Sequence, residues 1–313
     1  MKNIKWIGLL LCLGFVLSIN AQQLPRYSEY MFDKAIINPA YTGTIPYINS
    51  TLAYRKQFTG IEGAPTTQFL TFHAPIQKKN IGLGLKVVND KVATIATTSF
   101  AGMFSYYIGL GNGRLSVGLE AGLINQKIDF TNLVRHDAVD NAISANTQNK
   151  MVPDASVGLY YQTKSFFIGW SSFQLIKSEL NFTPDYGRSL VSRLWNHNYV
   201  VVGGNFGKNE DLRFEPSMLI KHVSPVPIQI DLNAKALIKQ LIAVGATYRV
   251  NEAIVAMVEL QIKDQFRIGY AFDYTTSKLA SYQNGTHEIL FTYRKKLLPP
   301  ARDKEIHPRY YIY

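Results

Sequence analysis

Few residues in this sequence have the types and spacing that catalysis or metal binding requires. Its six histidines show no metal-ligand spacing and no H-E-x-x-H motif. The adjacent His287 and Glu288 would point to opposite faces of a β-strand. His136-Asp137, with Asp140, could bind a cation or act in surface hydrolysis, but no partner set for catalysis is recognisable. We therefore predict no enzyme activity, no catalytic residues, no metal and no cofactor.

A glycine-rich segment, Gly109-Leu110-Gly111-Asn112-Gly113, has a weak likeness to a dinucleotide-binding loop. It lies between two predicted strands, and no helix follows it to supply an anion-binding N-terminus. We interpret it as a turn. The sequence also has no Walker A loop and no G-x-S-x-G nucleophile elbow.

The first 21 residues have the layout of a secretory signal peptide. Lys2 and Lys5 precede an uncharged apolar run from Trp6 to Val16, which is too short to span a bilayer as a helix. Small residues follow in Ser18-Ile19-Asn20-Ala21, where we predict cleavage. The single cysteine, Cys12, lies inside the apolar run without the small preceding residue of a lipidation site. The mature chain would therefore contain no disulfide and no cysteine nucleophile.

The positive charge of the chain does not indicate nucleic acid as a partner. Without the two signal lysines, 31 basic residues stand against 22 acidic ones, a formal charge of +9. The basic residues are scattered, with no basic stripe and no aromatic RNA-reading motif. An exported chain also has little opportunity to meet nucleic acid, so we expect no such binding.

The elements that must position these residues are β-strands, because apolar and polar residues alternate along most of the chain. From Ile228 to Ala236 one face is purely apolar and the other carries Gln, Asp, Asn and Lys. No mature segment has a comparable helical period. Fourteen alternating segments can be counted, near 48–58, 66–76, 80–89, 94–108, 114–126, 154–162, 165–174, 194–206, 211–221, 227–237, 240–250, 253–262, 265–274 and 285–295.

The connections between these segments fall into two classes. One set is short and polar or glycine-rich, whereas the other contains every long loop, near 127–153, 175–193 and 275–284. Long outer loops and short periplasmic turns are typical of outer-membrane barrels. We predict an all-β fold, a transmembrane antiparallel up-and-down β-barrel of about 14 strands in the bacterial outer membrane, contacting its lipid and lipopolysaccharide.

Aromatic residues at strand ends agree with girdles at the two membrane interfaces. A soluble β-sandwich would use the same aromatics as core, but it does not explain the sorting of the loops. The residues that we assign to the girdles are Tyr106, Tyr107, Tyr160, Tyr161, Trp170, Trp195, Tyr248, Tyr270, Tyr274 and Tyr293.

Four parts of the chain are thus predicted: a cleaved signal peptide (1–21), an N-terminal periplasmic or lumenal segment (22–47), the barrel (48–295) and a periplasmic C-terminal tail (296–313). By strand parity, some charged residues point into the lumen, where they either line water or hold a plug by ion pairs. Their mixed signs do not favour a strongly ion-selective pore. They are Glu120, Arg213, Glu215, Asp231, Lys235, Glu259, Arg267 and Asp273.

The most specific residues follow the signal. The stretches from Gln22 to Phe32 and from Ile37 to Gly43 (INPAYTG) resemble the opening of the PorP/SprF family, outer-membrane proteins of the type IX secretion and gliding machinery of Bacteroidetes. The likeness covers essentially the whole mature chain, with departures at Glu29 and Asp33. It continues through Tyr54-Arg55-Lys56-Gln57-Phe58, Gly63 to Gln68, Lys79 to Leu85, Asn89-Asp90-Lys91, Leu115 to Leu119 and Gly285 to Ile289.

The resemblance implies secretion or surface anchoring of a cargo that carries a type IX C-terminal signal domain, such as a gliding adhesin. It also implies contact with the periplasmic ring lipoprotein of that machine, and no catalytic residues. The opening motif would bind a partner or plug the lumen. An outer-membrane diffusion channel or small-molecule transporter is the alternative function. The candidate residues of the motif are Tyr27, Ser28, Tyr30, Met31, Phe32, Asn38, Pro39, Tyr41 and Gly43.

Overall fold

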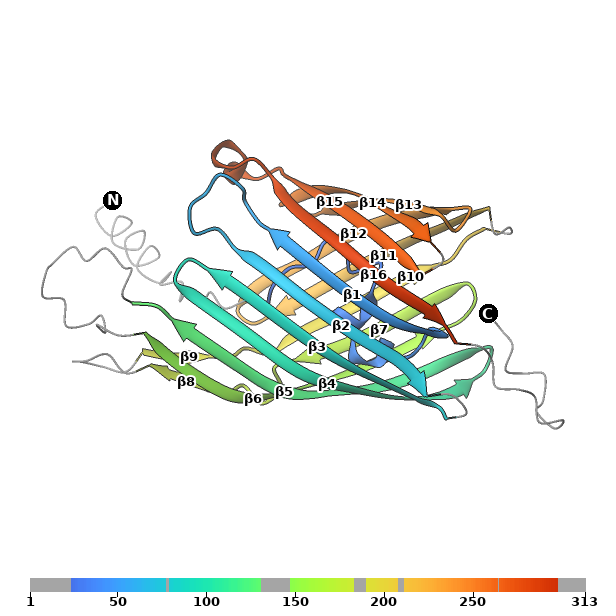
Figure 1. Cartoon of the computed structure of the whole chain (residues 1–313), viewed down its shortest axis with the longest axis horizontal. Coiled ribbons are helices and arrows are strands. Elements are labelled where there is room, and N and C mark those ends of the chain that lie inside the picture. The colour runs from blue at the N-terminus through green and yellow to red at the C-terminus, as the bar shows by residue number, and fades with distance from the viewer. Residues whose placement is uncertain are drawn as a thin grey trace, which may run out of the picture.

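The computed structural model describes residues 24–76, 79–130, 147–182, 190–207, 211–263 and 265–297. The predicted signal peptide, His136, Asp137, Asp140 and the tail beyond residue 297 lie outside these residues. Within them, fourteen antiparallel strands form a closed barrel (Figure 1). Consecutive barrel strands pair with each other, and β1 pairs with β16 over ten residues to complete the circle. The predicted barrel is confirmed.

Each barrel strand matches one of the alternating segments. The two longest have 16 residues each, and the shortest have eight. The barrel strands are β1 (Tyr47–Lys56), β2 (Thr66–Ile76), β3 (Ile81–Val92), β4 (Ile95–Leu110), β5 (Gly113–Ile128), β6 (Gln148–Gln162), β7 (Phe166–Phe173), β10 (His197–Gly204), β11 (Leu212–Val223), β12 (Val226–Ile238), β13 (Ile242–Arg249), β14 (Ala253–Lys263), β15 (Phe266–Thr275) and β16 (Thr286–Lys296).

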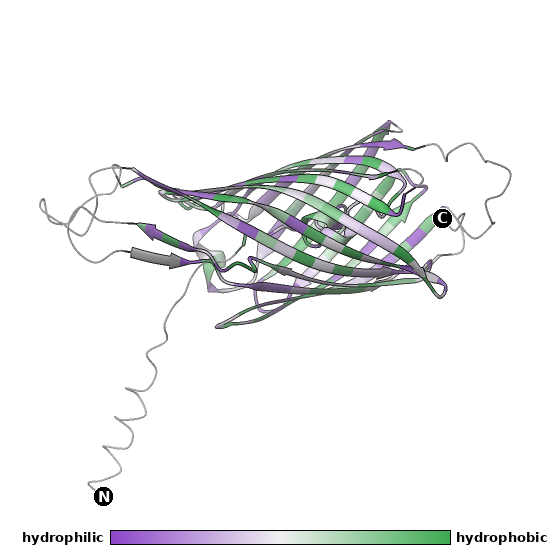
Figure 2. Cartoon of the chain, turned by 90° about the horizontal axis from the view of Figure 1, so that it is seen from below, coloured by the Kyte–Doolittle hydropathy of each residue, from purple (hydrophilic) through white to green (hydrophobic). Residues whose placement is uncertain are grey.

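The outer face of the barrel is apolar and the inner face is largely polar. In β1, Leu52 and Tyr54 are exposed on the outside, whereas Ala53 and Arg55 are buried inside. The same change of hydropathy from residue to residue runs along the strands in Figure 2. An apolar outer band suits hydrocarbon because every backbone group is satisfied within the closed sheet. The protein is an outer-membrane β-barrel.

The predicted aromatic girdles are correct for some residues and wrong for others. Tyr106, Trp170, Tyr248, Tyr270 and Tyr274 are exposed on the outer face. Tyr107 and Tyr160 are buried instead. Neighbouring residues of a strand point to opposite faces, so in each Tyr-Tyr pair only one ring can face lipid.

The two ends of the barrel differ as predicted. The short-turn end carries the tight connections, including Gly111-Asn112 between β4 and β5, so the glycine-rich segment is a turn. The long-loop end carries the hairpin of β8 (Glu179–Phe182) and β9 (Leu190–Arg193), where only a loop was predicted, and the short helix η3 (Lys278–Tyr282). Leu180 and Phe182 of this hairpin pack against Ile124 of β5 and against Leu194.

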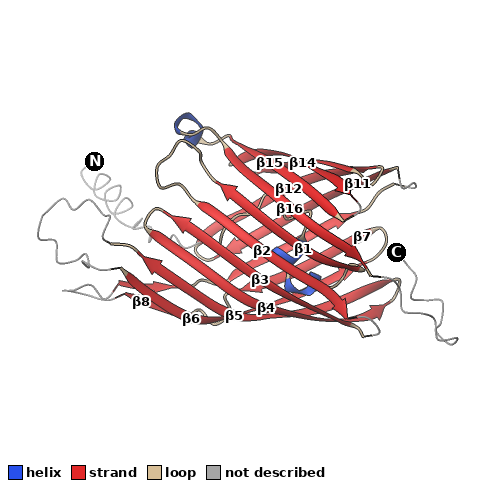
Figure 3. Ribbon diagram, viewed as in Figure 1, coloured by secondary structure: helices blue, strands red, loops and turns tan. Residues whose placement is uncertain are grey.

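Residues 24–46 lie inside the barrel, and we call them the plug. They contain two short 3-10 helices, η1 (Lys34–Ile36) and η2 (Pro39–Tyr41), which are drawn in blue behind the strands of the barrel wall in Figure 3. Apart from Leu24 to Tyr27, Tyr41 and the last two residues, the plug is buried. No helix in the described ranges is long and apolar enough to cross a membrane.

Candidate functional site

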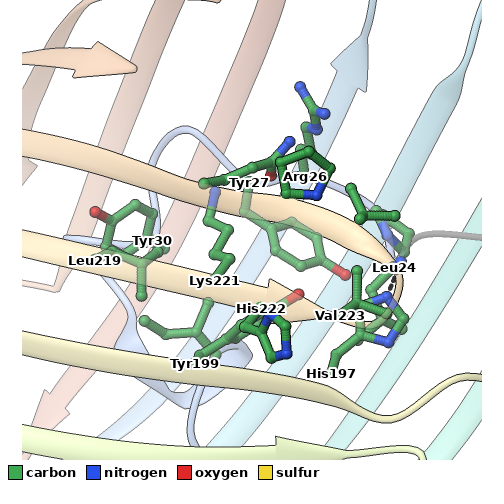
Figure 4. Close-up of a pocket in the computed structure, with 15 residues that line it drawn as sticks. Leu24, Arg26, Tyr27, Tyr30, His197, Tyr199, Leu219, Lys221, His222 and Val223 are labelled. Atoms are coloured by element: carbon green, nitrogen blue, oxygen red, sulfur yellow. Dashed lines mark hydrogen bonds between the residues drawn. The ribbon is translucent and has the colours of Figure 1, made fainter. Parts of the chain in front are cut away.

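The plug runs along the lumen from one end of the barrel to the other. At the long-loop end, the backbone N–H of Leu24 donates to His197 Nε2 at 3.2 Å (Figure 4), and Arg26 forms an ion pair with Glu252. At the short-turn end, the guanidinium of Arg114 donates to the carbonyl of Thr44, after which β1 begins. The chain therefore enters from the side of the long loops and crosses the lumen before it joins the wall.

A buried ion-pair cluster holds the first part of the plug, and we call it the Arg55 cluster. The Arg55 guanidinium contacts Asp273 Oδ2 at 2.7 Å and Glu288 Oε2 at 2.8 Å. Ser28 of the plug accepts a hydrogen bond from Arg55 and donates one to Asp273. The carboxylate of Glu288 also accepts from the backbone N–H groups of Ser28 and Glu29. Charge-assisted hydrogen bonds of this kind are among the strongest in proteins.

Asp33 joins the plug to the opposite side of β1. One carboxylate oxygen caps η1 by accepting from the N–H of Ala35, and the other accepts from Thr71 Oγ1 at 2.6 Å and from Asn49. Burial by itself would raise the pKa of Asp33, which lies outside the membrane-spanning strands. The nearby His73 and the hydrogen bonds outweigh burial and hold this pKa well below its usual range. Asp33 is thus a charged anchor inside the barrel.

Asn38 performs two tasks in the second half of the plug. Its Oδ1 accepts from the N–H of Ala40 and caps η2, while its Nδ2 donates to the carbonyls of Leu159 and Trp170 in the wall. Because one side chain both starts the helix and binds two neighbouring strands, the position of η2 in the lumen is defined by Asn38.

Glycines in the wall let the plug backbone lie directly against the strands. A Cβ built on Gly118 would come within 2.2 Å of the Ala40 nitrogen, and one on Gly82 within 2.2 Å of the Thr42 oxygen. Both distances are far below van der Waals contact, so only glycine fits there. Glycine at these two wall positions leaves the space that the plug backbone occupies.

Apolar side chains of the plug add packing to these polar anchors. Tyr30, Met31, Phe32, Ile36 and Ile37 are buried in one cluster with residues of the wall. Each such side chain contributes roughly 1.5–3 kcal/mol when it is removed from water. Tyr27 also contacts Phe69 edge to face at 5.1 Å between ring centroids, and Tyr41 contacts Tyr160 at 5.3 Å.

Glu29 is an exception among the polar residues of the plug. Its side chain is buried, neither carboxylate oxygen has a hydrogen-bond partner among the described residues, and one oxygen lies 2.6 Å from where a Cβ on Gly269 would be. Burial raises the pKa of this plug residue to about 10, and the carboxylate of Glu288 adds to the shift. Glu29 therefore stays protonated at neutral pH.

The eight charged residues assigned to the lumen by parity lie on the inner side of the wall, but they do not form one site. Glu120 pairs with Lys86, Asp231 with Lys221, and Asp273 joins the Arg55 cluster. The remaining five line a cavity near the short-turn end. They are Arg213, Glu215, Lys235, Glu259 and Arg267.

Sequence reasoning missed several charged residues of the lumen: Arg55 and Glu288, which bind the plug, Arg249, which contacts Asp273, and Lys86, which pairs with Glu120. The alternation of the strand does indicate that Arg55 faces the lumen, since Arg55 shares a face with Ala53. Arg55 and Glu288 each have a polar neighbour, Lys56 and His287, so the alternation of apolar and polar residues is lost at these positions. In the described part of the chain, no three His, Cys, Asp or Glu side chains are grouped to hold a metal ion.

Beside the small pocket around Leu24 and Tyr27 (Figure 4), two larger cavities lie next to the plug in the described part of the chain. One, of about 250 Å³, opens toward the long-loop end and is lined by residues such as Tyr27, Lys86, Glu120 and Phe173. The other, of about 200 Å³, lies near the short-turn end, and the two share no lining residue. The plug separates them.

Comparison with known proteins agrees with the resemblance. A family model described as type IX secretion system membrane protein PorP/SprF matches residues 19–293. No curated protein matches the chain. Among solved structures, it is similar to the Acinetobacter baumannii outer membrane protein Omp33 (8% identity, TM-score 0.45, covering 80% of this chain and 97% of that one). It is also similar to the Pseudomonas putida toluene transporter TodX (10%, 0.48, 85% and 94%).

Proposed function

Because this chain belongs to the PorP/SprF family of type IX secretion system membrane proteins, we propose that it is a closed outer-membrane barrel that binds protein partners of that machine. It has no chemistry of its own in this proposal. Its partners are a secreted cargo with a type IX C-terminal domain and the periplasmic ring lipoprotein, and its role is secretion or surface anchoring, as in gliding.

The plug is the observation that carries this proposal. It crosses the lumen and is anchored by the Arg55 cluster, Asp33 and Asn38, and the two larger cavities beside it share no lining residue. A diffusion channel needs a continuous water path along the lumen, and a plug held by this many buried anchors among the described residues argues against such a path. The alternative of a channel or small-molecule transporter is therefore less favoured than protein binding.

Most residues of the opening motif then serve to hold the plug in the barrel. Ser28, Tyr30 and Asn38 are each less than a tenth exposed, so a partner could not reach them while the plug is in place. Contacts with other proteins have to be made at the two ends of the barrel.

The long-loop end offers exposed apolar side chains for the cargo at two separate places on its rim, the connection after β7 and the helix η3. Leu175, Ile176, Leu279 and Tyr282 are exposed in connections beyond the barrel strands, and Tyr282 is 75% exposed. Exposed apolar groups outside the lipid-facing band are typical of protein-binding surfaces. We assign cargo contact to this end, which faces the outside in the usual barrel orientation.

The test combines cross-linking of intact cells, purification of the barrel and mass spectrometry of what it carries. We expect a large protein with a type IX C-terminal domain, or the ring lipoprotein, and no conductance in planar bilayers. A double variant, Ile176→Glu with Tyr282→Ser, should lose most of the cargo, whereas Gln240→Glu, exposed at the short-turn end, should not. Recovery of the barrel alone, with steady conductance, would refute the proposal and favour the channel.

A further inference from the structure

The cavity near the short-turn end has an unusual charge. It lies between the plug and the wall formed by β11 to β16, and its volume is about 200 Å³. Of the described residues, two acidic ones line it, Glu215 and Glu259, so this lining has a formal charge of three positive. The five basic residues of this basic cavity are Lys34, Arg213, Lys235, Arg267 and Arg294.

The two acids are already paired within the cavity wall. Glu215 contacts Lys34 at 2.9 Å and Lys235 at 3.1 Å. Glu259 contacts Arg267 at 2.9 Å. Three of the five cations are therefore held by these carboxylates.

The other two cations have no carboxylate among the described residues. Arg294 donates to the amide oxygen of Asn49 at 2.8 Å and to the carbonyl of Phe32 at 2.9 Å, and both acceptors are neutral. Arg213 is exposed and has neither an ion pair nor a hydrogen bond in the described part of the chain. Two guanidinium groups thus face a small cavity without an acidic partner.

The rest of the lining is apolar or aromatic. Met31, Phe32, Leu237 and Ala243 face the same cavity. A free inorganic anion would satisfy the charge but leave these side chains uncovered, whereas a peptide that combines acidic and apolar side chains would satisfy both. Guanidinium groups bind carboxylates through paired hydrogen bonds, which favours the same ligand.

We propose that the basic cavity binds an acidic and apolar peptide segment of a protein partner that approaches from the short-turn, periplasmic side. The inference deepens the proposed function and rests on it for the existence of that partner. Two carboxylates of the segment would pair with Arg213 and Arg294. Opposite charge would also speed the encounter and make it sensitive to salt.

The direct test uses the full-length barrel in detergent and a fluorescent peptide of about twelve alternating Glu and Leu residues. A peptide with Gln in place of Glu should bind with an affinity at least about tenfold lower. Added salt should lower the affinity of the Glu peptide. Arg213→Glu should weaken the Glu peptide by about tenfold or more, because a charged hydrogen bond is lost and repulsion replaces it. Lys164→Glu makes the same type of charge reversal at another short turn, outside the cavity lining, and should change the affinity less than about threefold.

Two outcomes would overturn the inference: equal binding of both peptides, or equal weakening of the Glu peptide by both variants. The same two variants are then compared in the cell cross-linking experiment. A partner recovered equally from wild type and Arg213→Glu would reject the cavity and leave the proposed function intact. No partner from wild type would reject the proposed function itself.

Discussion

Replacing Arg55 by methionine tests whether buried charge holds the plug in the barrel. Arg55 is only 3% exposed and contacts Asp273, Glu288 and Ser28. In the Arg55→Met variant, two buried carboxylates lose their shared cation, while Arg249 stays in contact with Asp273 at 3.2 Å. Removing one partner of a buried ion pair costs about 3–5 kcal/mol. We expect a loss of unfolding free energy of that order.

The assay has two parts, urea unfolding in detergent micelles and conductance in planar bilayers. Glu288 also accepts hydrogen bonds from the backbone of the plug. Because the variant removes the positive charge that pairs with Glu288, the plug should loosen and the barrel should conduct intermittently. Arg213→Met is the matched control. Arg213 is exposed and unpaired among the described residues, so this change should alter stability by less than about 0.5 kcal/mol and leave the barrel closed.

A triple variant separates charge from packing. Combining Arg55→Met with Asp273→Asn and Glu288→Gln removes the surplus negative charge and keeps the side-chain shapes. It should recover most of the stability that Arg55→Met loses. If Arg55→Met remains closed and as stable as the Arg213→Met control, the plug is held by packing alone and the argument from buried charge is wrong.

Two further predictions concern other contacts of the plug. Gly118→Val should displace η2 and give measurable conductance, because its Cβ would overlap the Ala40 nitrogen. The control Gly102→Val, whose Cβ would meet no atom closer than 4.0 Å, should stay closed. If both variants are closed, the glycine argument is wrong. Glu29→Gln should stabilise the barrel by at least about 1.4 kcal/mol at pH 7 and not at pH 4. The native acid has a folded pKa of about 10, well above its unfolded value, so it destabilises increasingly from pH 4.5 to 10; a pH-independent effect in thermal unfolding would contradict this.

The strands and their faces could be predicted because they follow from a local rule. Alternation in β1 places Leu52 and Tyr54 outside and Ala53 inside, whatever the rest of the chain does. The same parity places Glu120, Asp231 and the other selected charges on the inner face. It was misapplied only where residue type was given more weight than position, as for Tyr160.

The plug and its anchors could not be predicted in the same way. Arg55 and Glu288 are 233 positions apart and meet only because β1 pairs with β16 when the barrel closes. Asn38 finds the carbonyls of β6 and β7 only because the chain crosses the lumen first. The sequence by itself therefore determined the strands, their faces and the family. The tertiary structure decided which charges meet and which residues fill the lumen, because those partners are brought together by closure of the sheet and not by their spacing along the chain.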